Sequence, residues 1–140
     1  MNSLKLILKL IKNAKRVYLI GNGGSYANAV HICNDFLAHG VKAYTLDPAS
    51  LTASANDYGY ETVFSLWIEI VGERGDLLIA LSGSGKSPNI LEAIKTAKRK
   101  GMKTHLVTDY LRTLDMQQSE EDQLVWGHEM MRELRDELPR

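Results

Sequence analysis

Four short runs of apolar, β-forming residues recur along the chain and limit the folds available to it. They are Val17–Ile20, Lys42–Leu46, Leu77–Leu81 and Thr104–Thr108. Their starts are 25 to 35 residues apart, which suits strands joined by crossover helices. The runs show little polar alternation, which indicates strands buried on both faces, as in a parallel sheet covered by helices. We therefore predict an α/β fold, a doubly wound parallel sheet of four to five strands flanked by helices.

The segments around these runs carry helix signals. An N-terminal helix is predicted over residues 2–15, because its apolar residues lie on one face of a helix. Further helices are predicted at Tyr26–Leu37, Glu61–Val71, Pro88–Lys100 and about Ser119–Leu138. Ser87 and Pro88 have the residue types of an N-cap and a first helical position. In the last helix, apolar spacing places His128 on the buried face with Leu124, Met131 and Leu134.

Composition excludes several classes of protein. The chain has 140 residues, 44% of them apolar, which fits a single globular domain over residues 1–140. Its 17 basic and 17 acidic residues balance, so nothing favours nucleic acid as a partner. One cysteine, Cys33, excludes an internal disulfide framework and is expected to be buried. The longest apolar stretch, Val63–Val71, falls short of the ~20 residues of a membrane span, so we expect a cytoplasmic protein without membrane contact.

Two loops have the composition of phosphate-binding sites. Gly21–Ser25 and Ser82–Ser87 each follow a predicted strand and precede a predicted helix. Their glycines allow close approach of the backbone, their serines supply hydroxyls, and each helix start favours an anion. Both loops are expected at the carboxyl ends of neighbouring strands, where they would enclose one phosphorylated small molecule. A turn and helix cap without a ligand is the alternative.

A nucleotide site is a second possibility for the serine-containing loop. Ala80–Ser87 has the spacing of a relaxed P-loop, in which a lysine reaches phosphates and a serine holds Mg²⁺. However, alanine replaces the first glycine, and Pro88 adjoins the serine that would bind magnesium. Asp109 is the one candidate for a further metal-binding carboxylate after a strand. Nucleotide hydrolysis remains the least favoured hypothesis.

Three segments of the chain together resemble motifs of the SIS (sugar isomerase) domain family and, within it, of the phosphoheptose isomerases. They are Gly21–Ser25, Ala55–Gly59 and Ser82–Asn89. The resemblance runs from Arg16 to about Thr108 and resumes in the last helix. It implies a flavodoxin-like sandwich and isomerisation of sedoheptulose 7-phosphate in heptose or surface-glycan biosynthesis. Because a small sheet with apolar helices on its surface needs a partner, we expect a homodimer or homotetramer with sites at subunit boundaries. The chain is shorter than the family pattern, and a possible edge strand lies near Leu114.

The resemblance also implies site residues. The substrate-binding set is Asn22, Gly23, Gly24, Ser25, Asn56, Asp57, Ser82, Gly83, Ser84, Ser87 and Glu120. The family's serine loop usually reads Ser-Thr-Ser-Gly-Asn-Ser, so Gly83 and Lys86 are departures. Lys86 adds a positive charge that would either strengthen phosphate binding or change which phosphate is preferred.

A metal motif follows from the same resemblance. His31 and Asp35 match the family's histidine and glutamate, His128 matches its last-helix histidine, and Glu120 stands at its glutamine. One Zn²⁺ per site is implied, held by His31, Asp35, Glu120 and His128. An aldose–ketose isomerisation passes through an enediol and needs a base, an acid and a group that polarises the carbonyl. Asp35 is the candidate base and His128 the candidate acid.

Two alternatives remain open at this point. A histidine inside a helix is commonly a packing residue, and the chain could be a non-catalytic SIS module that binds a sugar phosphate or acts as a regulatory or assembly partner. The shorter Asp35 and the acidic Glu120 are compatible with that alternative. His39 and His105 have no partners in sequence and are expected to be structural.

Overall fold

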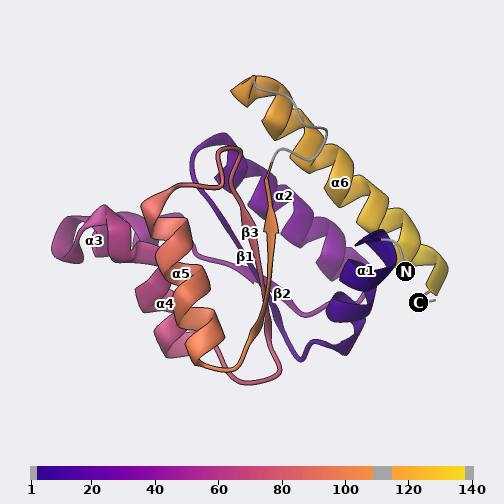
Figure 1. The fold of residues 1–140 in the computed structure, drawn as a ribbon, viewed down its shortest axis with the longest axis horizontal. Coiled ribbons are helices and arrows are strands. Elements are labelled where there is room, and N and C mark those ends of the chain that lie inside the picture. Colours follow the sequence, from indigo (N-terminus) through magenta and orange to yellow (C-terminus); the bar gives the residue numbers. More distant parts are fainter. Residues whose placement is uncertain (1–2, 109–114, 138–140) are drawn as a thin grey trace.

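A four-stranded parallel sheet forms the centre of the molecule (Figure 1). The computed structural model describes residues 3–108 and 115–137. The strands are β1 (Val17–Gly21), β2 (Ala43–Thr45), β3 (Leu77–Leu81) and β4 (Lys103–Val107), and their order in the sheet is β2-β1-β3-β4. The helices are α1 (Ser3–Asn13), α2 (Gly24–Ala38), α3 (Pro48–Tyr58), η1 (Tyr60–Thr62, a short 3₁₀ turn), α4 (Val63–Val71), α5 (Pro88–Arg99) and α6 (Met116–Glu137). The predicted fold class is confirmed.

Helices cover both faces of the sheet because its strands alternate their side chains between two cores. On β1, Val17 and Leu19 pack into the core beneath α1, α2 and α6, while Tyr18 and Ile20 pack into the core beneath α4 and α5. Figure 1 shows α1, α2 and α6 on one face and α3, α4 and α5 on the other. The uninterrupted apolar character of the strands thus reflects burial on both sides.

Helix α3 was not among the predicted elements. None of its residues is fully buried, so its sequence lacks the apolar periodicity on which helix prediction depends. Its start nevertheless has a signal: Asp47 is the N-cap and accepts a hydrogen bond from the Ser50 backbone N–H at 2.8 Å, and Pro48 follows it. This hydrogen bond lowers the pKa of the Asp47 carboxyl. The Asp-Pro pair could have located the helix.

The buried face of α6 differs from the predicted one. Trp126, Met130 and Leu134 are buried, whereas Leu124 is only partly so. The Trp126 ring stacks on His105 of β4, with centroids 5.9 Å apart. This packing turns His128 away from the core, and its side chain is 38% exposed beside α2. The prediction that His128 shares the apolar face was therefore wrong.

Some predicted features lie outside the described residues. The possible edge strand near Leu114, the carboxylate of Asp109 and the end of the last helix at Leu138 are among them. Within the parts that the structure describes, no helix is both long enough and apolar enough to cross a membrane.

Candidate functional site

The two predicted phosphate loops meet at the carboxyl edge of the sheet. β1 and β3 are neighbours, but the chain leaves β1 toward α2 on one face and β3 toward α5 on the other. Such a switch point leaves a crevice outside the strand ends, where doubly wound folds bind ligands. Here the crevice is a cavity of about 280 Å³.

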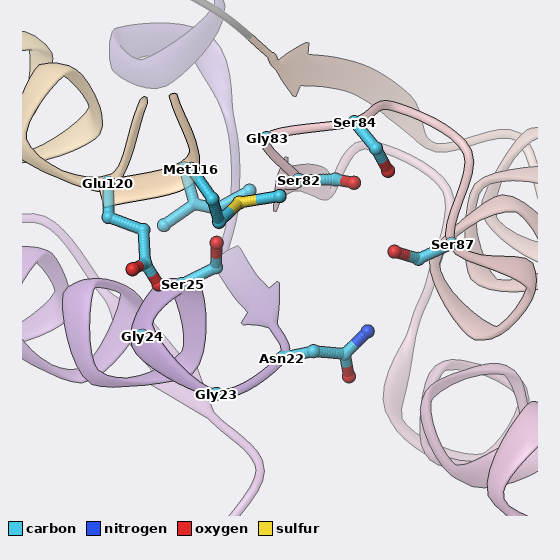
Figure 2. A pocket seen from close by; sticks show the side chains of 11 residues that line it. Asn22, Gly23, Gly24, Ser25, Ser82, Gly83, Ser84, Ser87, Met116 and Glu120 are labelled. Atoms are coloured by element: carbon cyan, nitrogen blue, oxygen red, sulfur yellow. The ribbon is translucent and has the colours of Figure 1, made fainter. Parts of the chain in front are cut away.

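Most of the predicted substrate-binding residues line this cavity (Figure 2). The full lining is Asn22, Gly23, Gly24, Ser25, Leu81, Ser82, Gly83, Ser84, Ser87, Met116 and Glu120. Asn56 and Asp57 are not among these residues: both are exposed on α3, where Asn56 Nδ2 donates to Asp57 Oδ1. Lys86 is exposed and also absent from the lining. Met116 joins the site from α6, and no sequence motif indicated it.

A reciprocal pair of amides joins the two loops. Asn22 Nδ2 donates to Asn89 Oδ1, and Asn89 Nδ2 donates to Asn22 Oδ1, both at 2.9 Å. The hydroxyl of Tyr60 donates a second hydrogen bond to Asn22 Oδ1 at 2.7 Å. Asn22 therefore fixes the geometry of the cavity, and only one of its amide hydrogens is left for a ligand. Asn89, which is buried at the start of α5, was not predicted as a site residue.

Three serine oxygens of the cavity each accept a hydrogen bond from the protein. Ser82 Oγ accepts from the Gly85 backbone N–H at 3.0 Å, and Ser84 Oγ accepts from the Lys86 backbone N–H at 3.1 Å. Ser25 Oγ accepts from Gln123 Nε2 at 3.0 Å. A hydroxyl that already accepts keeps its O–H hydrogen for donation. The cavity is consequently rich in donors, as an anion requires.

Two helix starts add a favourable potential for an anion, and one acid opposes it. α2 and α5 begin at the cavity, and neither N-cap residue, Gly23 or Ser87, makes a side-chain capping bond. Their N–H groups and dipoles favour negative charge. Glu120 reaches from α6 to the first turn of α2, where its carboxylate fills the space that a Cβ on Gly24 would need. Glu120 thus occupies one of the two positive helix ends.

Close packing of α6 explains the glycine at position 83. A Cβ on Gly83 would lie 2.7 Å from Met116 Sδ and 3.0 Å from Ser119 Oγ. A threonine at this position, as in the resembled family, would require the Met116 and Ser119 side chains of α6 to shift. The departure in the serine loop and the position of α6 are therefore linked.

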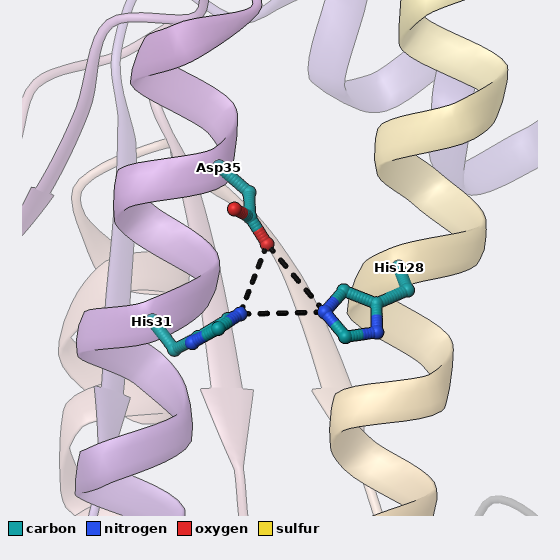
Figure 3. Close-up of side chains that lie close together, drawn as sticks. All are labelled: His31, Asp35 and His128. Atoms are coloured by element: carbon teal, nitrogen blue, oxygen red, sulfur yellow. Dashed lines mark hydrogen bonds and ion pairs between the residues drawn. The ribbon is translucent and has the colours of Figure 1, made fainter.

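A second cluster lies farther along the same two helices. His31 and Asp35 on α2 converge with His128 on α6 (Figure 3). His31 Nε2 is 3.3 Å from His128 Nε2 and 3.3 Å from Asp35 Oδ2, and His128 Nε2 is 3.9 Å from Asp35 Oδ2. Asp35 Oδ2 is buried and makes no hydrogen bond. The one-methylene shortening relative to glutamate therefore still lets the carboxylate reach both imidazoles.

These three residues fit a metal ion. Ligand atoms on a tetrahedral Zn²⁺, with bonds of about 2.0–2.1 Å, lie about 3.3–3.4 Å apart, which is close to two of the three observed separations. Two imidazoles and a carboxylate are ligands that zinc accepts, and they leave a fourth position open. A buried carboxylate oxygen without a hydrogen bond is itself costly unless a cation is bound.

Among the residues that the structure describes, the cluster consists of His31, Asp35 and His128, and Glu120 does not join it. It precedes His128 by eight residues, or about 12 Å along an ideal helix. His31 likewise lies about 10 Å beyond Gly24 along α2. The cavity and the cluster are therefore two ends of one seam between α2 and α6, and Glu120 belongs to the cavity end.

Known proteins share the sequence pattern of this chain. Residues 2–109 match the SIS domain family. The chain belongs to the SIS domain family. Over 100 residues it is 47% identical to the phosphoheptose isomerase of Burkholderia pseudomallei strain 1710b, covering 66% of this chain and 51% of that protein. The chain spans about half the length of the curated relatives it matches. The serine loop is therefore that of a SIS domain and not of a P-loop fold.

Solved structures agree with this SIS fold. The structure of the phosphoheptose isomerase of Neisseria gonorrhoeae superposes with a TM-score of 0.87 at 27% identity, over 96% of this chain and 83% of that one. A phosphoheptose isomerase of Francisella tularensis superposes with a TM-score of 0.88 at 23% identity, over 95% and 84% of the two chains. The second comparison supports the fold alone.

Three side chains of this SIS domain that the sequence predicts to be structural, Cys33, His39 and His105, have partners within the fold. Burial raises the pKa of the Cys33 thiol, which suits the inert packing residue that we expected. His39 Nδ1 contacts the Asp35 backbone oxygen at 2.8 Å near the end of α2. His105 lies against Trp126, and burial lowers its pKa. None of the three lines the cavity or joins the cluster.

Proposed function

We propose that this chain is a sugar-phosphate isomerase that interconverts an aldose and a ketose, with sedoheptulose 7-phosphate as its substrate in heptose or surface-glycan biosynthesis. The observation that carries the proposal is the seam between α2 and α6. One end is a cavity of hydroxyl donors and helix starts, and the other is a cluster of two imidazoles and a carboxylate. The phosphoheptose isomerases among its relatives support the choice of reaction and substrate.

The separation of the two ends supports a long substrate. A phosphate in the cavity and a carbonyl at the cluster would lie on the order of 10 Å apart, because Gly24 and His31 are separated by that length of helix. A triose phosphate is too short for this span, whereas an extended heptose phosphate suits it. The cavity residues Ser25, Ser82, Gly83, Ser84 and Ser87, with Gly23 and Gly24, would hold the phosphate.

Proton transfer would occur at the other end of the seam. Asp35 is the proposed base that removes a proton from the carbon next to the carbonyl, through the carboxylate oxygen that would not hold the metal. His128 is the proposed acid that returns a proton, through the ring nitrogen that would not hold the metal. His31, Asp35 and His128 would hold the metal, which we propose is zinc. When bound, the metal supplies a Lewis acid that polarises the carbonyl oxygen. His128 and His31 remain accessible to a substrate, with side chains 38% and 50% exposed.

Turnover of sedoheptulose 7-phosphate by the metal-stripped and zinc-restored chain tests the proposal. We expect zinc-dependent formation of the aldose, reduced at least about 100-fold in His128→Ala. His39→Ala removes a histidine outside the cluster and should keep most of the turnover. Binding of the sugar phosphate without product under any metal would overturn the isomerase.

That outcome would favour a second function, a SIS module that binds a sugar phosphate without converting it. The observation behind it is Glu120, whose carboxylate opposes the anion that the rest of the cavity favours. The two functions differ in turnover and not in binding.

We further propose that residues 1–140 form one SIS domain that works in the cytoplasm as a homodimer or homotetramer, with sites at subunit boundaries. Large apolar side chains at the surface support association: Ile70 is 82% exposed and Tyr58 is 70% exposed. Both line an apolar groove between α3 and α4. Light scattering of the purified chain should give a mass at least twice that of a monomer, and a monomeric mass would contradict this proposal.

A further inference from the structure

A chain of hydrogen-bonded amides, which begins at the partly buried Asn28, runs behind the cavity between α2 and α6. Gln123 is fully buried and Ser25 is 5% exposed. Asn28 Nδ2 donates to the Glu120 backbone oxygen at 2.7 Å and to Gln123 Oε1 at 3.0 Å, and Gln123 Nε2 donates to Ser25 Oγ at 3.0 Å. Asn28 and Gln123 do not line the cavity, and neither was predicted from the sequence.

The direction of this chain is fixed by its first member. A backbone carbonyl only accepts, so the Asn28 atom that faces the Glu120 oxygen must be the amide nitrogen. The same nitrogen contacts Gln123, so Gln123 must present its oxygen there. Gln123 is left with its NH₂ group toward Ser25, and Ser25 Oγ has to accept. Either amide turned over would leave two donors or two acceptors in contact, which is costly in a buried site.

The consequence lies in the cavity. Because Ser25 Oγ accepts from Gln123, its hydrogen remains for donation, and Figure 2 shows the Ser25 oxygen pointing into the cavity. We propose that Gln123, oriented by Asn28, is a positioning residue that makes Ser25 a hydrogen-bond donor to a phosphate ester. This inference rests on the proposed function, because it names the selectivity of the same cavity. The ligand class is an oxyanion that only accepts, and a sugar hydroxyl group would be a poorer occupant.

Reversal of the hydrogen bonds from Asn28 through Gln123 to Ser25 tests the proposal. Asn28→Asp also gives up the bond to the Glu120 backbone oxygen, so it is paired below with Gln123→Met, which leaves that bond in place. In Asn28→Asp the carboxylate can only accept, so it attracts the NH₂ group of Gln123 and turns the Gln123 oxygen toward Ser25. Ser25 then donates to Gln123 and is lost to the ligand. We expect inorganic phosphate, measured by calorimetry, to bind about tenfold more weakly.

The matched control is Ala27→Asp, which adds the same charge to the neighbouring exposed position of α2. It should change phosphate binding by no more than about twofold. A second variant, Gln123→Met, keeps a similar length without an amide and should also weaken phosphate binding. Thermal unfolding of each variant shows that it is folded.

A double-mutant cycle separates positioning from a merely structural role. In Ser25→Ala there is no hydroxyl to orient, so adding Gln123→Met should leave phosphate binding unchanged. Additive losses, equal effects of Asn28→Asp and Ala27→Asp, or no phosphate binding by the unmodified chain would each overturn the inference. Sedoheptulose 7-phosphate turnover is scored separately. If the cycle is non-additive but no turnover is seen, the inference stands and the proposed function fails. If turnover is seen but the cycle is additive, the proposed function stands and the inference fails.

Discussion

The two ends of the α2–α6 seam differ in how their polar groups are satisfied. At the cavity, three of the four serine oxygens and the Asn22 amide already have partners within the protein. At the cluster, Asp35 Oδ2 has no hydrogen bond, and two ring nitrogens face it at 3.3 and 3.9 Å. Most polar groups of the cavity are therefore hydrogen-bonded before a ligand binds, whereas Asp35 Oδ2 at the cluster is satisfied only when a ligand binds.

This difference indicates two kinds of binding. Internal hydrogen bonds hold the cavity in shape and leave serine hydroxyl hydrogens to offer, so a ligand meets preorganised donors beside the Glu120 carboxylate. The cluster offers lone pairs that converge on one point, which is the arrangement that a cation stabilises. Changes at one end should therefore leave binding at the other end largely intact.

The largest predicted effect comes from neutralising the cluster. Asp35→Asn keeps the shape but removes the charge and the base, so metal affinity should fall and turnover should drop at least about 100-fold. Inorganic phosphate should bind as before, as measured by calorimetry. Asn34→Ala, at an exposed neighbouring position, is the control. Loss of phosphate binding in Asp35→Asn would break the separation between the two ends.

A change at the cavity should affect stability first. Gly83→Thr restores the side chain of the family's loop, but it collides with Met116 and Ser119. The free energy of unfolding in urea should fall by about 1–3 kcal/mol. Ser84→Thr also places a threonine in the loop, but it adds only a methyl group at an exposed position and should cost much less. Met116→Ala should partly rescue Gly83→Thr, and a fully stable Gly83→Thr would contradict the close packing of α6.

Removal of the Glu120 charge should strengthen phosphate binding in the cavity. Glu120→Gln takes a negative charge from the start of α2, so phosphate should bind about threefold more tightly. Glu121→Gln, an exposed neighbour on the same helix, makes the same charge change away from the cavity and should have little effect. Weaker phosphate binding in Glu120→Gln would show instead that the carboxylate supports the site.

The smallest predicted effect lies outside both ends, where α6 packs on β4. Burial lowers the pKa of His105, so the folded protein protonates this imidazole less readily than the unfolded chain does. Below its ordinary pKa of about 6.5, the unfolded chain takes up a proton that the folded chain does not, and stability falls as pH drops. His105→Phe keeps the ring against Trp126 and should reduce the fall in thermal unfolding midpoint between about pH 7.5 and about pH 5.5. An unchanged pH dependence would assign it to other groups.

Sequence predicted the sheet well because its strands are buried on both faces and are separated by crossover helices of ordinary length. It also indicated the two loops, whose motifs are local, whereas His31, Asp35 and His128 were indicated by the resemblance to SIS domains. The sequence did not predict α3, because this helix lacks an apolar face. It also predicted the wrong buried face for α6, with His128 toward the core. The relay from Asn28 through Gln123 to Ser25 links positions nearly a hundred residues apart, and such pairings arise only from tertiary packing.

The central claim is that the seam holds the two ends of one long substrate, and a pair of titrations tests it most directly. Inorganic phosphate reaches the cavity alone, whereas a heptitol 7-phosphate, which has no carbonyl to isomerise, reaches the cluster as well. Calorimetry of both ligands with metal-stripped and zinc-loaded protein should show zinc tightening heptitol phosphate binding about tenfold while phosphate binding stays unchanged. Equal effects of zinc on both ligands, or no effect on either, would contradict the account.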